Sequence, residues 1–144
     1  WSDYGWPPLH TFGDFLAPNI HPVLDRPALP AAAAARWARQ RAEAVARTTG
    51  RPVFVKETGW PNGGTPRFTA EDQAVFWRAW LETGRLVRLG EPPVWVSHAA
   101  AFEAFDAPWK AKALASAIEG RWGLLDRERR SYPAFEVWRE RAGR

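Results

Sequence analysis

Residues 52–64 read Pro-Val-Phe-Val-Lys-Glu-Thr-Gly-Trp-Pro-Asn-Gly-Gly, and this stretch decides the fold. Its first part, Val53-Phe54-Val55, is the run of β-branched and aromatic residues typical of a strand buried on both faces. Residues 58–64 are rich in Gly, Pro and Asn and predict a loop. Glu57 stands at the junction. A carboxylate is costly to bury without a partner, so Glu57 must face a polar opening or form an ion pair, with Lys56 or with an Arg of a neighbouring unit.

A strand, a loop and a helix follow one another three times along the chain. The first unit consists of the apolar run Phe15–His21 and an Ala- and Arg-rich helix from about Pro30 to Thr49, which ends at Gly50. Proline suits the first turn of a helix, and glycine is the usual residue just past its end. Strands that alternate with helices indicate parallel strands joined by right-handed crossovers.

The second and third units follow the same plan. The strand Pro52–Glu57 leads to a helix over about 70–83, for which Thr69 is the expected N-cap. The third strand is predicted from Val94 to Phe105, and a last helix from about Pro133 to Arg141. No stretch between the units reads as a linker. The chain is therefore expected to form one domain or one piece of a domain.

Polar residues stand where each predicted strand ends: Asn19 and His21, then Glu57, then Asp106. Barrel enzymes place their chemistry at the carboxyl ends of the strands, because those ends converge on one opening. Three strands cannot close a barrel, and a complete (β/α)₈ barrel needs about 250 residues. We therefore expect residues 1–144 to be part of an α/β TIM barrel whose N-terminal strands lie upstream of Trp1.

Composition narrows the classes of function. The 20 basic residues outnumber the 16 acidic ones, but they are scattered through helical segments and form no basic stripe, so a nucleic-acid partner is not expected. No run approaches the ~18 apolar residues of a membrane span. The chain has no Cys and three His, which stand in no metal-ligand spacing, and neither Gly-rich nucleotide motif is present. The expectation is no metal and no cofactor.

Tryptophan is unusually abundant, with ten residues in the chain. Its large ring serves packing in most proteins, and its apolar face also stacks on sugar rings. Four Trp lie in stretches with helical periodicity and are predicted to be core residues: Trp37, Trp77, Trp80 and Trp138. Trp60, Trp109 and Trp122 stand beside Gly, Pro and charged residues, and these three are the candidates for contact with a sugar.

Four segments together resemble glycoside hydrolase family 17, the β-1,3-glucanase family. Residues 56–64 are similar to the family's nucleophile segment at the end of the seventh strand. Residues 102–110, Phe-Glu-Ala-Phe-Asp-Ala-Pro-Trp-Lys, resemble the eighth-strand segment in its bacterial form. Residues 15–22 are similar to the sixth-strand Asn-x-Tyr-Pro segment, with His21 in place of Tyr, and residues 118–124 resemble a downstream segment that contains a Glu. The segments occur in the family's order.

The resemblance implies a retaining glycosidase that comprises strands 6–8 of the barrel, with Glu57 as the nucleophile and β-glucan as the partner. The family's acid/base Glu ends the fourth strand, upstream of Trp1, so the chain alone is expected to be inactive. The resemblance also implies a periplasmic or extracellular location. The predicted substrate-binding residues are Asn19, His21, Trp60, Phe105, Asp106, Lys110, Glu119 and Trp122.

Several alternatives stay open on the sequence alone. His21 could bond a sugar hydroxyl or Glu57, or have only a structural role, and Glu103 could face the site or a structural cation. Ala107 stands where many family members have Glu, so one site carboxylate is absent. The same motifs fit hydrolysis and transglycosylation equally. They also fit a carbohydrate-binding remnant without catalysis, and an α/β domain with strand-end ion pairs remains the least specific interpretation.

Overall fold

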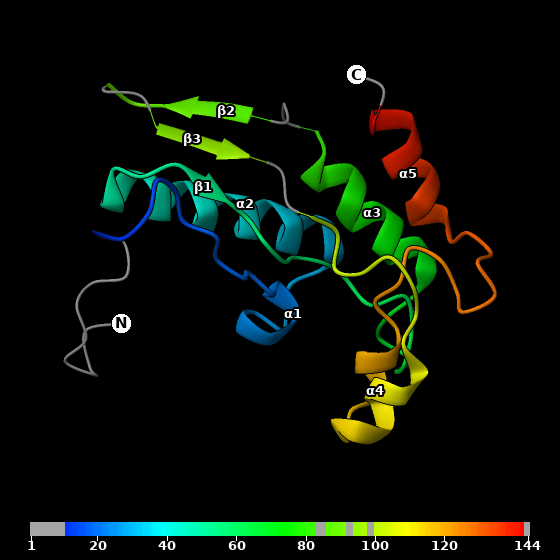
Figure 1. The fold of residues 1–144 in the computed structure, drawn as a ribbon. Coiled ribbons are helices and arrows are strands. Elements are labelled where there is room, and N and C mark those ends of the chain that lie inside the picture. The colour runs from blue at the N-terminus through cyan, green and yellow to red at the C-terminus, as the bar shows by residue number, and fades with distance from the viewer. Residues whose placement is uncertain (1–10, 83–85, 92–93, 98–99, 143–144) are drawn as a thin grey trace.

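A computed structural model describes residues 11–82, 86–91, 94–97 and 100–142 (Figure 1). The elements in chain order are α1 (Pro22–Asp25), α2 (Ala31–Thr49), β1 (Val53–Phe54), α3 (Ala70–Trp80), β2 (Leu86–Leu89), β3 (Val94–Ser97), α4 (Pro108–Ala113), the 3-10 helix η2 (Ala117–Gly120) and α5 (Pro133–Ala142). The mixed α/β architecture agrees with the predicted fold class. The short helices α1, α4 and η2 were not predicted.

The three strands form one sheet in the order β1-β3-β2. Strands β1 and β3 run parallel, with Val53 opposite Val96, as their separation by α3 predicts. Strand β2, which was not predicted, pairs antiparallel with β3 at the edge of the sheet. Only residues 90–93 connect these two strands, and so short a connection permits only an antiparallel pair.

The first predicted strand lies beside β1. The N–H of Leu16 donates to the carbonyl of Pro52 at 2.8 Å, and the N–H of Phe54 donates back to Leu16 at 2.8 Å. Parallel bridges join Leu16 to Val53 and Asn19 to Glu57. The segment 16–20, β1 and β3 therefore lie side by side in the order of the three predicted units.

The third predicted strand, Val94–Phe105, is shorter than expected. Strand β3 ends at Ser97, residues 98–99 lie outside the described part of the chain, and the backbone then leaves the regular sheet. It returns to the β1 side once, where Ala101 forms a parallel bridge with Thr58. Alanine contributes little side-chain packing to a strand, which agrees with the early end of β3.

The long helices begin and end close to the predicted residues. Helix α2 ends at Gly50, whose φ of 64° is the left-handed conformation that glycine adopts without strain. At the start of α3, the hydroxyl oxygen of Thr69 accepts a 3.0 Å hydrogen bond from the N–H of Asp72. This cap confirms the predicted start of the helix, which ends at Trp80, before the predicted 83.

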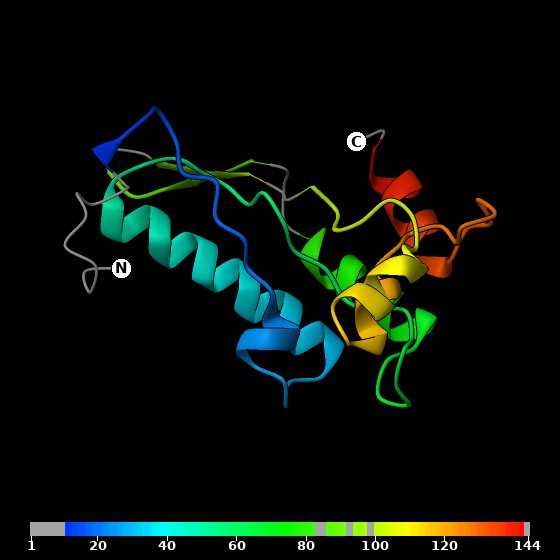
Figure 2. The ribbon, with the colours of Figure 1, turned by 60° about the horizontal axis from the view of Figure 1, so that its bottom comes forward.

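The core lies between one face of the sheet and the helices. Helix α2 runs along that face with a stripe of fully buried alanines, and α3 packs between α2 and α5 (Figures 1 and 2). Trp77 and Trp80 are 0% and 1% exposed, as predicted for core residues. On the opposite face of the sheet, Phe54 and Trp95 each remain 38% exposed. Within the described ranges, no helix has the length and apolarity to span a membrane.

Candidate active site

Glu57 lies three residues beyond β1, at the point where the neighbouring segment 16–20 ends. The N–H of Ile20 donates to the carbonyl of Glu57 at 2.9 Å, and this register brings the next residue, His21, beside the Glu57 side chain. That side chain is 30% exposed. Glu57 therefore has both an ion pair and an open side, the two features that the sequence posed as alternatives.

Each carboxylate oxygen of Glu57 has a nitrogen partner. His21 Nε2 lies 3.4 Å from Oε2, and Lys56 Nζ lies 3.3 Å from Oε1. Partial burial alone would raise the pKa of Glu57, but the hydrogen bonds and charges of His21 and Lys56 outweigh that effect and hold the pKa below its ordinary value. The carboxylate is thus ionised at neutral pH and fixed at the end of the strand.

Two aromatic rings pack against the ring of His21. Its ring lies edge-on to Phe102 at 5.3 Å between centroids and edge-on to Trp122 at 5.6 Å. The His21 side chain is only 15% exposed, and its Nδ1 is buried with no partner among the described residues. Of the roles that the sequence left open, the geometry favours contact with Glu57.

Lys110 and Glu103 form an ion pair on the other side of Phe102. Lys110 Nζ contacts the Glu103 carboxylate and lies 4.8 Å from the centroid of the Phe102 ring. Their side chains are 18% and 22% exposed. The partner of Glu103, which the sequence did not settle, is therefore Lys110. Because Phe102 also contacts His21, this pair is one aromatic ring away from the His21–Glu57 contact.

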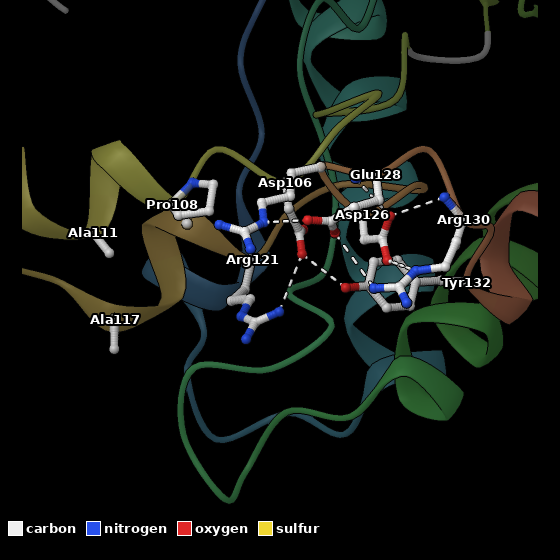
Figure 3. A pocket seen from close by; sticks show the side chains of 11 residues that line it. Asp106, Pro108, Ala111, Ala117, Arg121, Asp126, Glu128, Arg130 and Tyr132 are labelled. Atoms are coloured by element: carbon white, nitrogen blue, oxygen red, sulfur yellow. Dashed lines mark hydrogen bonds and ion pairs between the residues drawn. The ribbon is translucent and has the colours of Figure 1, made fainter.

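Asp106 is buried in a hydrogen-bond network, and this corrects its predicted contact with sugar. Its side chain is 3% exposed. Oδ1 accepts hydrogen bonds from Asn62 at 2.8 Å and from the N–H of Gly123 at 3.0 Å. Oδ2 accepts one from Tyr132 at 2.8 Å and lies 3.3 Å from Arg121 (Figure 3). A carboxylate that has four donors and is almost fully buried is a structural anchor.

Three residues of this buried network were missed from the sequence. Asn62 and Tyr132 bond Asp106, and Gln73 donates to the carbonyl of Gly123 at 3.0 Å. Asn62 was interpreted only as a turn residue. The available signal was Gln73, because it occupies the apolar stripe of α3, one turn before Phe76 and Trp77, and a polar residue there needs a buried partner.

Trp60 and Trp122 are core residues, which corrects their predicted contact with sugar. They are 3% and 1% exposed, so neither ring offers a face to a ligand. Trp60 packs with Phe68 at 5.3 Å and Phe76 at 5.9 Å. Trp122 lies beneath His21. Of the three Trp that the sequence singled out, Trp109 alone is open, at 69% exposure.

Three predicted site residues remain, namely Asn19, Phe105 and Glu119. Asn19 is exposed next to Glu57 in the bridge between the strands, and Phe105 is 45% exposed. Glu119 is half-buried in η2. Among the described residues, the ion pairs of the Glu57 side chain are those with His21 and Lys56, so the roles of Asn19, Phe105 and Glu119 stay predictions.

Gly59 explains why the loop after Glu57 passes so close to its neighbour. A Cβ at this position would lie 2.3 Å from the carbonyl oxygen of Phe102. The close approach is fixed by the hydrogen bond from the N–H of Phe102 to the carbonyl of Thr58, at 2.9 Å. Glycine is therefore needed here to let the loop beneath the site pack on the segment that holds His21.

A cleft of about 400 Å³ opens beside Asp106, between α4 with η2 and the loop 126–130 (Figure 3). Its lining combines the cations Arg121, Arg127 and Arg130 with the carboxylates Asp106, Asp126 and Glu128, so its charges balance. Glu57 is not among the lining residues. In the described part of the chain, no group of three or more potential ligands is arranged to hold a metal ion.

By sequence, the chain is similar to two fungal proteins named glucan endo-1,3-beta-glucosidase btgC. The protein of Aspergillus niger is 27% identical over 141 residues, which cover 90% of this chain, and that of Aspergillus fumigatus is 28% identical over 143 residues, which cover 86%. The chain spans 20% of the length of each. No protein-family profile matches the chain. Since these relatives are fungal, they give no support for the bacterial form of the motif.

By structure, the chain is similar to a glycoside hydrolase family 17 beta-1,3-glucanosyltransferase from Rhizomucor miehei, with a TM-score of 0.68 and 22% identity. The match covers 91% of this chain and 46% of that one. An active-site mutant of that enzyme in complex with laminaritriose gives a TM-score of 0.64 at 20% identity. The chain therefore has the fold of part of that structure. The relatives described here are named for activity on β-1,3-glucan.

Proposed function

We propose that the chain forms the last three strand–helix units, strands 6–8, of a TIM-barrel glycoside hydrolase of family 17 that acts on β-1,3-glucan. The observation that supports this most is the Glu57 carboxylate, which stands at a strand end, partly exposed, with a nitrogen partner on each oxygen. A retaining glycosidase needs such a fixed, ionised carboxylate as its nucleophile. The sequence relatives, named as glucan endo-1,3-beta-glucosidases, suggest the substrate class.

In the proposed reaction, an oxygen of Glu57 forms a bond to the anomeric carbon while the glycosidic C–O bond breaks. The leaving oxygen takes a proton from a second carboxylic acid, and the product is a covalent glucosyl–Glu57 ester. A water molecule, activated by the same second carboxylate, then hydrolyses the ester with retention of configuration. In the proposed complete enzyme, the second carboxylic acid belongs to an earlier strand of the barrel.

The bare face of the sheet supports the proposal that further strands belong to the enzyme. Phe54 on β1 and Trp95 on β3 are 38% exposed on the face that α2 does not cover. Parallel strands are normally buried on both faces, and inside a barrel these side chains would lie in the packed interior. The match covers 46% of the Rhizomucor chain, so the further strands of the proposed enzyme would correspond to the unmatched part of that chain.

Two substitutions of Glu57 in the complete enzyme test its role. Glu57→Gln is expected to abolish hydrolysis of a laminari-oligosaccharide with the fold retained, and activity within tenfold of the unmodified enzyme would refute the nucleophile assignment. Glu57→Gly, given an α-glucosyl fluoride donor, is expected to synthesise oligosaccharides, because the donor mimics the missing ester. The same donor with the unmodified enzyme is the control.

A second candidate function is transfer of the glucosyl chain to another sugar. It is favoured by the likeness to a glucanosyltransferase, and it differs only in that a sugar hydroxyl, instead of water, resolves the ester. Products longer than the supplied laminari-oligosaccharide would indicate transfer. Products that are only shorter would indicate hydrolysis.

A further inference from the structure

The two oxygens of the Glu57 carboxylate have partners of very different exposure. His21, the partner of Oε2, is 15% exposed, whereas Lys56, the partner of Oε1, is 54% exposed. A lysine on a flexible, solvated stem is easily displaced, and a ring enclosed by its neighbours is not. We infer that His21 is a positioning residue that anchors Oε2 of Glu57 and leaves Oε1 as the oxygen that attacks the sugar. This inference rests on the proposed function of Glu57.

The position of His21 is fixed from three sides. Phe102 and Trp122 contact the ring edge-on at 5.3 and 5.6 Å. The His21 carbonyl accepts hydrogen bonds from the N–H groups of Leu24 and Asp25, both at 3.0 Å, where α1 begins. The aromatic contacts restrain the ring and the carbonyl hydrogen bonds restrain the backbone of His21, so the anchor is more rigid than a surface contact.

The buried Nδ1 of His21 identifies which nitrogen bears the proton. Nδ1 has no partner among the described residues, and a hydrogen on it would be a buried donor without an acceptor. A hydrogen on Nε2 instead points to Oε2 of Glu57, 3.4 Å away. The hydrogen-bond geometry therefore assigns His21 as an Nε2–H donor to the carboxylate.

The oxygen Oε1 has the opposite environment. Its partner Lys56 immediately precedes Glu57 in the sequence, and the Lys56 side chain is 54% exposed. A sugar that approaches through the opening can displace the ammonium group without disturbing the fold. The other charged groups nearby, Lys110 and Glu103, form an ion pair with each other next to Phe102. His21 and Lys56 are therefore the groups that lower the pKa of Glu57.

Two substitutions at His21 in the complete enzyme separate hydrogen bonding from packing. His21→Gln keeps an N–H near the position of Nε2, and His21→Phe keeps a ring but has no donor. We expect His21→Phe to lower kcat by about 10²-fold with little change in KM, because the carboxylate is no longer aligned. We also expect the acidic limb of the kcat/KM profile to move to higher pH, because one donor that lowers the pKa of Glu57 is gone. His21→Gln should retain more than a tenth of kcat and keep the limb in place.

Lys56→Met is the matched variant for the other oxygen. It should also move the acidic limb to higher pH, since it removes a cation, but it should lower kcat by less than tenfold. The inference is overturned if His21→Phe keeps kcat within threefold, if neither His21 variant moves the limb, or if Lys56→Met costs more than His21→Phe. Activity in Glu57→Gln would refute the proposed function itself, and an inactive Glu57→Gln beside an unaffected His21→Phe would refute only this inference.

A measurement on the unmodified complete enzyme does not depend on whether a substituted variant folds. The nitrogen chemical shifts of His21 distinguish a hydrogen on Nε2 from one on Nδ1. An Nε2–H signal that shifts as Glu57 titrates is the expected result. An Nδ1–H form, or an Nε2–H form that does not respond to Glu57, would contradict the anchor even if enzyme assays were ambiguous.

Discussion

Tyr132 donates a 2.8 Å hydrogen bond to Oδ2 of Asp106, a carboxylate whose side chain is only 3% exposed. The bond ties the segment before α5 to the end of the third predicted strand. Burial, followed by the Asp106 hydrogen bond and charge, raises the pKa of Tyr132, as expected for a phenol that donates to an anion. Asp106 is therefore important to the stability of the fold, a role that its position at a predicted strand end did not indicate.

The first prediction concerns this pair. Tyr132→Phe and Asp106→Asn should each lower the free energy of unfolding by about 1–3 kcal/mol, because each leaves a buried polar group without its partner. The double variant should lose less than the sum, with a coupling of about 0.5–3 kcal/mol in urea denaturation. Strictly additive losses would show that the two residues act independently.

The second prediction tests the close approach at Gly59. A Cβ there would lie 2.3 Å from the Phe102 carbonyl oxygen, whereas a Cβ at Gly63 would meet nothing nearer than the Arg121 side chain at 3.9 Å. Gly59→Ala should therefore lower stability by about 1–3 kcal/mol or more through overpacking, and Gly63→Ala should change it by less than about 0.5 kcal/mol. Thermal melting of the two variants decides the matter, and equal melting temperatures would count against the packing argument.

The third prediction uses two arginines of α2 that share one partner. Arg39 is 6% exposed, donates to the carbonyls of Val96 and Ser97 at 3.4 Å, and lies 3.6 Å from Glu43. Arg47 lies 3.3 Å from the same Glu43, but its side chain is 58% exposed. Arg39→Met should cost about 1–3 kcal/mol because it removes buried hydrogen bonds to β3, and Arg47→Met should cost less than about 0.5 kcal/mol because its ion pair is exposed. Comparable losses in chemical denaturation would refute the distinction.

The fourth prediction concerns the pH dependence of stability at Glu57. Its pKa is lowered in the folded chain, below an ordinary value of 4.5, so its stabilising contribution is present above pH 4.5 and is lost as the pH falls through the folded-state pKa. The difference in unfolding free energy between the unmodified chain and Glu57→Gln should therefore shrink below pH 4.5. Glu140→Gln, an exposed change on α5, is the control. A difference that stays constant from pH 7 to pH 3 would contradict the ion pairs seen here.

Sequence patterns predicted the elements whose cause is local. Gly50 and Thr69 mark the end of α2 and the start of α3 because capping depends on a few adjacent residues. The place of Glu57 at the end of a parallel strand followed in the same way from Val53-Phe54-Val55. Strand β2 was missed because its pairing depends on β3 and not on its own sequence.

The candidate site was predicted less well, because burial is not local. Trp60, Trp122 and Asp106 stand beside loop residues in the sequence, and loop residues are usually exposed. In the structure these side chains turn inward, since the loops fold over one another at contacts such as the one between Asn62 and Asp106. The His21–Glu57 contact could be anticipated only as one of several alternatives, because the register of two strands decides it.

The burial of the loop after Glu57 changes what its sequence signature means. Thr58, Gly59 and Trp60 are buried, and they join the loop to residues around Phe102 and Trp122 whether or not any sugar is bound. These residue types are thus needed mainly because the backbone segments pack closely here. Selection for a stable scaffold would preserve them in a protein that had lost catalytic activity. Comparisons that aim to tell active relatives from inactive ones should compare Glu57 with its two donors, and should give the glycine and the tryptophan little weight.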